Sequence, residues 1–169
     1  MIMYRKLNIN EAQSFWNLMN QLDYETRYML YEPGERAEKA SNVCRLEGVI
    51  KESLEGDDFL LAAEVRGQLV GYISAQKGSL HRIAHTAYIV VGILKDYRNR
   101  GIGTEFFKQL DAWASEKKVF RLELTVVCEN EIAKHLYEKS GFVVEGIKRK
   151  SVLVDGKFLD EYYMAKITD

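Results

Sequence analysis

A glycine-rich turn that joins a dense apolar strand to an amphipathic helix most constrains what this chain can fold into. The apolar run Thr86–Leu94 is typical of a central strand that is covered on both faces, and a helix is expected from about Thr104 to Lys117. Gly101 and Gly103 lie in the turn between them. Because the first N–H groups of a helix lack intrahelical partners and the helix dipole favours negative charge there, this turn predicts an anion-binding site.

Two arginines, Arg98 and Arg100, add positive charge to the turn, and a phosphate is the ligand that they and the glycines favour. The nucleoside-triphosphate loop is excluded, because Gly-x-x-x-x-Gly-Lys-Ser/Thr is absent. The dinucleotide fingerprint is also excluded, because it needs a third glycine where Phe106 stands. Taken alone, two glycines at this spacing are equally compatible with a plain turn.

The remaining pattern predicts one mixed α/β sheet with helices on both faces, formed by a single domain over residues 1–169. Asn10 is the expected N-cap of the first helix. The chain contains no internal repeat and no linker. Strands are expected at Met3–Leu7, Phe59–Val65, Leu69–Gln76, Thr86–Leu94, Arg121–Val127 and, as two strands turning at Asp155-Gly156, about Ile147–Ile167; the other helices are expected at about Glu35–Leu54 and from Asn130 to Ser140.

Composition narrows the classes of function that the chain can have. Its 169 residues include 24 Lys and Arg against 25 Asp and Glu, a net charge of −1, which argues against a nucleic-acid-binding protein. No apolar run approaches the roughly 20 residues of a membrane span, and no secretory signal is recognisable at the N-terminus. Two cysteines cannot form a disulfide framework, so a cytoplasmic protein is expected. The three histidines show no metal-ligand spacing, and no metal is expected.

Two motifs together resemble the GNAT superfamily of N-acetyltransferases. The first is the pyrophosphate signature Arg98-x-x-Gly101-x-Gly103, placed after a strand and before a helix. The second is Asn130-x-x-Ala133-x-x-Leu136-Tyr137-Glu138-Lys139-x-Gly141-Phe142. The C-terminal part, with Glu145-Gly146, Asp155-Gly156, Asp160 and Met164, is similar to the branch that includes the ribosomal-protein N-terminal acetyltransferases. The resemblance implies a mixed, mostly antiparallel seven-stranded sheet that is splayed at its central strand.

The resemblance also implies acetyl-CoA as the cosubstrate and assigns residues to it. The pantetheine arm pairs with the central strand, and Asn130 both caps its helix and hydrogen-bonds that arm. Gly92 fits either a bulge in this strand or a close packing contact. The residues implied for the pyrophosphate are Arg98, Asn99, Arg100, Gly101, Ile102, Gly103 and Thr104, and those beside the pantetheine arm are Val91, Gly92, Ile93 and Leu94.

By the same resemblance, the reaction is direct transfer of the acetyl group to a primary amine, either a peptide N-terminus or a small molecule. A backbone N–H near Val91 or Gly92 stabilises the developing oxyanion, and Tyr137 donates a proton to the departing sulfur. Two alternatives stay open: a non-catalytic acyl-CoA-binding or sensor domain of the same fold, and a protein for a different phosphate ligand. A homodimer is compatible with either enzyme or sensor.

The general base and the acceptor are less well specified. The ribosomal-protein alanine acetyltransferases place a glutamate where this chain has Thr125, which cannot take a proton. Glu123 shares the strand face with Thr125 but lies farther along it, and His85 and Tyr88 are the nearest titratable groups, so no base is assigned. The acceptor is expected to contact Tyr28, Tyr31 and Glu32, because aromatic faces and a carboxylate attract an ammonium group.

Overall fold

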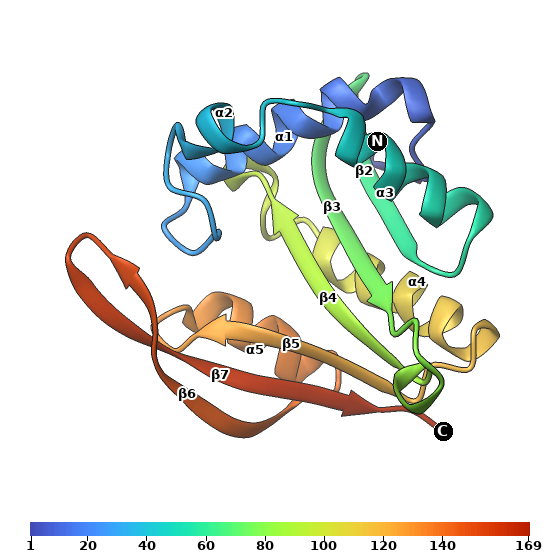
Figure 1. Cartoon of the computed structure of the whole chain (residues 1–169), viewed down its shortest axis with the longest axis vertical. Helices are drawn as coiled ribbons and strands as arrows, with labels where there is room; N and C mark the ends of the chain where they lie inside the picture. The colour runs from blue at the N-terminus through green and yellow to red at the C-terminus, as the bar shows by residue number, and fades with distance from the viewer. The chain divides into compact units, whose positions relative to one another are not determined.

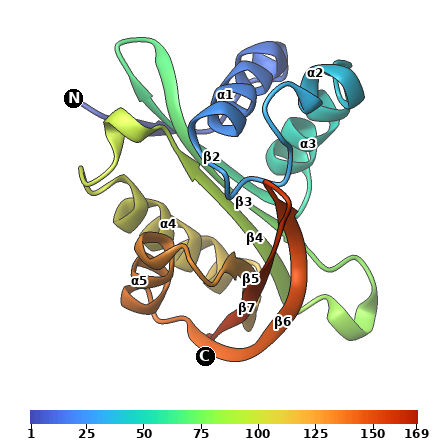
Figure 2. The same ribbon diagram turned by 90° about the vertical axis from the view of Figure 1, so that its left-hand side faces the viewer.

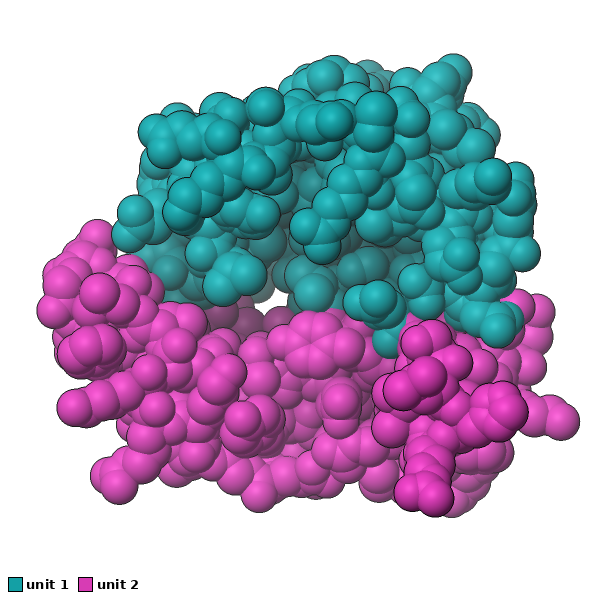
Figure 3. All heavy atoms as spheres, viewed as in Figure 1, with its two compact units in different colours: residues 1–76, 90–106 teal, residues 77–89, 107–169 magenta.

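The computed structural model describes residues 1–169, which group into two compact units (Figure 3). Unit 1 comprises Met1–Gln76 and Val90–Phe106, and unit 2 comprises Lys77–Ile89 and Phe107–Asp169. The boundaries fall before the last residue of one strand, within a second strand and within a helix, so that these three elements contribute to both units. The two units are described separately below.

Seven strands and five α-helices make up the chain (Figure 1). The sheet order is β1-β2-β3-β4-β5-β7-β6, and the expected mixed, mostly antiparallel seven-stranded sheet is confirmed. The strands are β1 (Met3–Arg5), β2 (Phe59–Val65), β3 (Gln68–Lys77), β4 (Thr86–Ile93), β5 (Arg121–Val127), β6 (Val143–Val154) and β7 (Lys157–Ile167); the helices are α1 (Ala12–Glu25), α2 (Glu35–Lys39), α3 (Cys44–Glu55), α4 (Ile102–Glu116) and α5 (Glu131–Lys139).

In unit 1, helices cover both faces of the sheet. The adjacent residues Ala62 and Ala63 of β2 point to opposite faces of the sheet. Ala63 pairs with Tyr4 of β1, and Ala62 pairs with Tyr72 of β3, so the two tyrosines also lie on opposite faces. The ring of Tyr4 meets Phe106 of α4 edge to face at 5.9 Å, whereas Tyr72 meets Phe15 of α1 at 5.0 Å. Helix α3 packs beside α1 (Figure 2). Aromatic contacts therefore fix one helix to each side of β1–β3.

A buried ion pair ties α2 to α1 within unit 1. Arg36 donates from Nε to Asp23 at 2.6 Å and from Nη2 at 3.2 Å, and the two residues are only 8% and 1% exposed. The guanidinium also lies over the ring of Tyr31, 4.4 Å from its centroid. Buried charges are tolerated only when they are paired, so this contact fixes the position of the short helix and the segment before it.

In unit 2, β5 alternates between a buried and an open face. Leu122, Leu124 and Val126 are buried, whereas the residues between them are only partly covered. Helices α4 and α5 pack together through Phe107 and Tyr137, whose rings lie 5.8 Å apart. Strands β6 and β7 form a long hairpin, drawn in orange to red in Figures 1 and 2, which turns at the expected Asp155-Gly156. The φ angles there are 49° and 76°, as a two-residue type I′ turn requires.

The single helix expected at Glu35–Leu54 is wrong, because two helices occupy that stretch. The Asn42 side chain accepts a hydrogen bond from the Cys44 amide at 2.9 Å, at the point where the second helix, α3, begins. The Ala40 carbonyl, at the end of α2, instead accepts the indole N–H of Trp16 at 2.6 Å. Ser and Asn side chains compete with helical hydrogen bonds, and here a tertiary contact adds to that competition.

Three boundaries also differ from the sequence prediction. Asn10 does not cap α1, because it lies inside a preceding 3₁₀ turn in which the Glu11 carboxylate accepts the Asn8 amide at 2.7 Å. Helix α4 starts at Ile102 rather than Thr104. Strand β6 starts at Val143 rather than about Ile147, and it continues through a register shift between Val144 and Gly146.

None of the helices combines the length and the apolar character needed to cross a membrane.

We expect Asp23→Ala to lower the free energy of unfolding by about 3–5 kcal/mol, since it leaves the Arg36 guanidinium buried without a counter-charge. Urea denaturation followed by circular dichroism measures this change. Glu55→Ala serves as the control, because the Lys51–Glu55 pair is long, at 3.9 Å, and more than 60% exposed on both sides. The control should lose no more than about 0.5 kcal/mol. Equal decreases in the free energy of unfolding of the two variants would show that the buried pair stabilises the protein no more than the exposed pair does.

Burial raises the pKa of Tyr72 to about 12, above the ordinary value near 10. A raised folded-state pKa means that the contribution to stability is complete below the unfolded pKa and is lost as pH rises toward the folded one. The stability difference between wild type and Tyr72→Phe should therefore fall between about pH 10 and about pH 12. Unfolding free energies of both proteins across this range test it, and a constant difference would contradict it.

Candidate functional site

The turn between β4 and α4 has the backbone shape of an anion site. Asn99 and Gly101 both adopt positive φ, 58° and 81°, so the chain reverses sharply within four residues. The amide of Glu105 is the first to close the helix, donating to the Gly101 carbonyl at 3.0 Å. The amides of Ile102, Gly103 and Thr104 precede that bond and have no intrahelical acceptor. A Cβ on Gly101 would meet nothing within 4 Å, so the space above the turn is open within unit 1.

Both arginines of this turn are held by neighbouring groups. Arg98 donates from Nε to the carbonyl of Ile93 at 3.0 Å, which anchors the turn to the end of β4. The guanidinium of Arg100 lies over the ring of Tyr97, 5.2 Å from its centroid, and Arg100 is exposed. The turn therefore carries two positioned positive charges beside the free helix amides, which is the combination that binds a phosphate.

The two edges of β4 are used differently at its end. The Leu94 amide donates to the carbonyl of Val70 in β3 at 2.9 Å, so Leu94 faces β3. The carbonyl of Ile93 faces the other way, where it meets Arg98. Backbone N–H and C=O groups alternate in direction along a strand, so those of Val91 are directed away from β3, as those of Ile93 are. Of the four residues expected beside a pantetheine arm, only Val91 and Ile93 thus direct backbone groups away from β3.

Gly92 is required by packing. A Cβ at this position would lie 2.7 Å from Leu22 Cδ1 of α1 and 3.4 Å from the ring of Tyr72. The close-contact interpretation of this glycine is therefore confirmed, whereas a bulge in β4 stays a prediction.

Tyr28, Tyr31 and Glu32 all lie in the segment between α1 and α2. The ring of Tyr31 stacks on Arg36, which fixes its orientation, and the Tyr28 amide donates to the Thr26 hydroxyl at 3.2 Å. Glu32 is exposed, and its backbone amide donates a hydrogen bond to the Glu35 carboxylate at 3.0 Å. Lys39, and then this amide, lower the pKa of Glu35. The Glu35 carboxylate is thus bonded to the Glu32 amide and to Lys39, whereas the Glu32 carboxylate faces solvent.

In unit 2, the start and the interior of α5 hold the other two predicted residues. Asn130 accepts the amide of Ala133 at 3.3 Å, which confirms it as the N-cap and leaves its NH₂ group to donate elsewhere. Tyr137 is 8% exposed, and its ring packs on Phe107 and Phe142. The ring has a structural role that phenylalanine could also fill.

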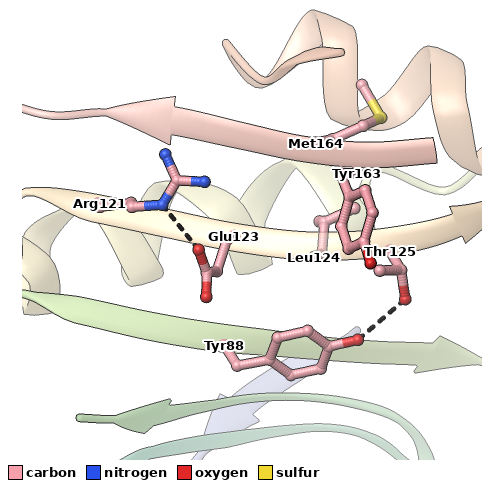
Figure 4. Close-up of a pocket in the computed structure, with 7 residues that line it drawn as sticks. All are labelled: Tyr88, Arg121, Glu123, Leu124, Thr125, Tyr163 and Met164. Atoms are coloured by element: carbon pink, nitrogen blue, oxygen red, sulfur yellow. Dashed lines mark hydrogen bonds and ion pairs between the residues drawn. The ribbon is translucent and has the colours of Figure 1, made fainter. Parts of the chain in front are cut away.

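A pocket of about 290 Å³ opens on the β4–β5–β7 face of unit 2 (Figure 4). The hydroxyls of Tyr88 and Thr125 lie 3.0 Å apart across it. Thr125 stands where the resemblance to the ribosomal-protein alanine acetyltransferases implies a glutamate, and its hydrogen-bond partner is the phenol of Tyr88. Seven residues line the pocket: Tyr88, Arg121, Glu123, Leu124, Thr125, Tyr163 and Met164.

The far end of this pocket is closed by a charged cluster. Arg121 donates to Glu123 at 2.6 Å and to both oxygens of Glu145 at 3.0 and 2.6 Å. This pairing lowers the pKa of Glu145. Glu145 reaches Arg121 from a register shift in β6, between Val144 and Gly146. The sequence prediction missed Arg121, Glu145 and Tyr163, because a bulge and a cross-strand pairing leave no local signal.

The predicted residues fall into two groups. Unit 1 brings together the end of β4, the turn to α4 and the Tyr28–Glu32 segment, whereas unit 2 holds Asn130 and Tyr137. No group of three or more His, Cys, Asp or Glu side chains is arranged to hold a metal ion.

Comparison with known proteins identifies relatives of this chain. The profile of the Acetyltransferase (GNAT) family matches residues 16–142, well over half of the chain. The L-amino acid N-acetyltransferase AaaT of Escherichia coli (strain K12) is 32% identical over 111 residues, which cover 63% of this chain and 67% of that protein.

Solved structures share the fold over the whole length. An acetyltransferase of the GNAT family from Streptococcus pneumoniae superposes with a TM-score of 0.92 at 25% identity, covering 100% of both chains. A ribosomal-protein-alanine N-acetyltransferase from Brucella melitensis gives 0.83 at 22% identity, covering 98% of this chain and 99% of that one. The acetyltransferase yncA from Salmonella typhimurium, solved with acetyl-CoA, gives 0.84 at 15% identity, covering 99% and 94%.

We expect Gly101→Val to destabilise the protein by about 1–2 kcal/mol, because an L-residue with a branched side chain is strained at a φ of 81°. The strain is confined to the backbone, since a Cβ there meets no other atom. Thermal unfolding measures the effect, and the affinity for coenzyme A, from calorimetry, should fall as well. Gly101→Asn is the matched control, because asparagine tolerates this conformation. A valine variant as stable as the asparagine variant would contradict the argument.

Proposed function

This chain belongs to the Acetyltransferase (GNAT) family, and we propose that it transfers the acetyl group of acetyl-CoA directly to a primary amine. The observation that carries the proposal is the family match together with the free helix amides and two arginines at the turn into α4. We also propose that it works in the cytoplasm, because both cysteines are free and Cys44 is exposed. Acetyl-CoA and an amine are its proposed partners, with a homodimer as the proposed assembly.

The residues at the turn fit the pyrophosphate of acetyl-CoA. The amides of Ile102, Gly103 and Thr104 and the guanidinium of Arg100 are proposed to bind it, while the backbone of Arg98, Asn99 and Gly101 shapes the turn. The open space above Gly101 and the missing acceptors for these amides support this assignment.

The end of β4 is proposed to hold the pantetheine arm along the edge that faces away from β3. Val91 is proposed to supply its backbone groups there and Ile93 its amide alone, because the Ile93 carbonyl already accepts from Arg98. Gly92 and Leu94 are proposed to line the arm without pairing with it, because Leu94 is already bonded to Val70. Asn130 is proposed to donate its NH₂ group to the same arm, which its capping role permits. Acetyl-CoA supplies an activated acyl group at its thioester.

Two groups of the chain are proposed to act during transfer, the Val91 amide and the Tyr137 phenol. The neutral amine forms the new N–C bond as the C–S bond breaks, and the Val91 amide donates to the thioester oxygen as negative charge develops on it. Tyr137 gives its phenolic proton to the departing sulfur, so that coenzyme A leaves as the thiol. The amine's own proton passes to water.

Acceptor contacts are proposed for Tyr28, Tyr31 and Glu32. The fixed ring of Tyr31 and the solvent-facing carboxylate of Glu32 support this role, because both attract an ammonium group. No side-chain base is assigned: Thr125 carries no carboxylate, and Glu123 is bonded to Arg121.

We expect Tyr137→Phe to lower kcat by on the order of 10²-fold or more, because the proton donor is lost while the ring packing on Phe107 remains. The measurement is release of the coenzyme A thiol in the presence of a panel of amines, with coenzyme A binding followed in parallel by calorimetry. Tyr4→Phe removes a hydroxyl from β1, outside every proposed role, and should leave kcat unchanged.

Two outcomes would count against the proposal. Turnover that survives Tyr137→Phe would remove Tyr137 from the reaction. If coenzyme A binds the wild type but no amine accelerates thiol release, the chain is a non-catalytic acyl-CoA-binding domain instead.

A further inference from the structure

One end of the pocket of unit 2 is bordered by a charged cluster of Arg121, Glu123 and Glu145, in which Arg121 and Glu123 line the pocket and Glu145 lies behind them. Arg121 is its only cation, and all three guanidinium nitrogens are bonded, Nε to Glu123 and the other two to Glu145. Two carboxylates therefore share one guanidinium, which leaves a surplus of one negative charge. Figure 4 shows the Glu123 carboxylate between Arg121 and Tyr88, with one oxygen turned away from Arg121. The one cation of the pocket is thus already paired with carboxylates, and the other side-chain donors that line it are the uncharged hydroxyls of Tyr88, Thr125 and Tyr163.

The opposite end of the pocket suits an amine. The Tyr88 and Thr125 hydroxyls, 3.0 Å apart, present oxygen atoms that can accept N–H bonds. Tyr163 pairs with Thr125 across β5 and β7, so its ring lies on the same face (Figure 4). Tyr88 and Tyr163 are 44% and 46% exposed, so their rings are accessible. An aromatic face and hydroxyl oxygens near a surplus carboxylate attract a cation and repel an anion.

We propose that this pocket receives the amine end of the acceptor and selects amines that carry no free carboxylate next to the amine. The contacts proposed for Tyr28, Tyr31 and Glu32 are then with the rest of the acceptor. The class includes simple alkylamines, amino-acid amides and peptide N-termini, in which the neighbouring carboxylate is absent or held as an amide. Free α-amino acids are disfavoured, because their carboxylate would face Glu123 with Arg121 already occupied. This selectivity differs from the amino-acid acceptors named for the relative AaaT. The inference rests on the proposed acetyl transfer and specifies its substrate.

Matched pairs of acceptors test the proposal: glycine, L-methionine and L-phenylalanine against their amides, with acetyl-CoA and thiol release as the readout. Each amide should have a kcat/KM at least about tenfold above that of its acid, a factor that corresponds to about 1.4 kcal/mol. Because an amide also lowers the pKa of its own amine, the wild-type ratio alone does not isolate the pocket. The change in that ratio between variants does, since the amine's chemistry is the same for every variant.

Glu123→Gln removes the surplus charge and should reduce the amide-to-acid ratio by about tenfold while coenzyme A affinity stays constant. Glu116→Gln makes the same chemical change at an exposed position at the end of α4 and should leave the ratio unchanged. Tyr88→Phe retains the ring and loses the hydroxyl, so the KM for amides should rise while that for acetyl-CoA does not. This variant tests the pocket even if Glu123→Gln does not fold.

The outcomes separate this inference from the proposed function. Free amino acids that react as well as their amides, or a ratio that Glu123→Gln and Tyr88→Phe leave untouched, would overturn the pocket assignment while acetyl transfer stands. Absence of turnover with every amine, together with coenzyme A binding, would overturn both.

Discussion

The left-handed turn at Asn99 and Gly101 is the constraint on which the rest of the proposed site depends. It converts the end of β4 into the start of α4 within a few residues, so that the first helix amides stay without partners beside two arginines. Arg98 then bonds back to the Ile93 carbonyl, which couples the shape of the turn to the edge of the strand. A helix that started earlier would satisfy those amides and move the free N–H groups to other residues, away from this turn.

A pair of charged side chains is buried in unit 1, whereas the charged cluster of unit 2 lies at the surface. In unit 1, the buried Asp23–Arg36 pair fixes the segment that holds Tyr31, and Leu22 and Tyr72 fill the space that Gly92 leaves beside β4. In unit 2, the open face of β5 places its charges at the surface, where Arg121 is shared by two carboxylates. The first arrangement makes a segment rigid, whereas the second sets the electrostatic character of a pocket.

Much of the fold was readable from local signals. Strands β2, β3 and β5 were predicted close to their observed bounds, the Asp155-Gly156 pair predicted the turn of the last hairpin, and Asn130 was correctly predicted as a helix cap. The errors arose where a distant group competes with a local preference. Trp16 binds the Ala40 carbonyl and helps to divide a helix that its own sequence would have continued. Strand β6 begins at Val143, before the expected start near Ile147, and contains the irregularity at Glu145.

By itself, the sequence determined the strand–turn–helix unit with its glycines and arginines, because positive φ and free helix amides depend on residues adjacent in the chain. The tertiary structure decided which groups of that unit remain available: Leu94 is bonded to β3, and Ile93 is bonded to Arg98. It also decided that Thr125 faces Tyr88 and that Arg121 is occupied by Glu123 and Glu145. These pairings join residues up to 37 positions apart, and only the registers of neighbouring strands bring them together.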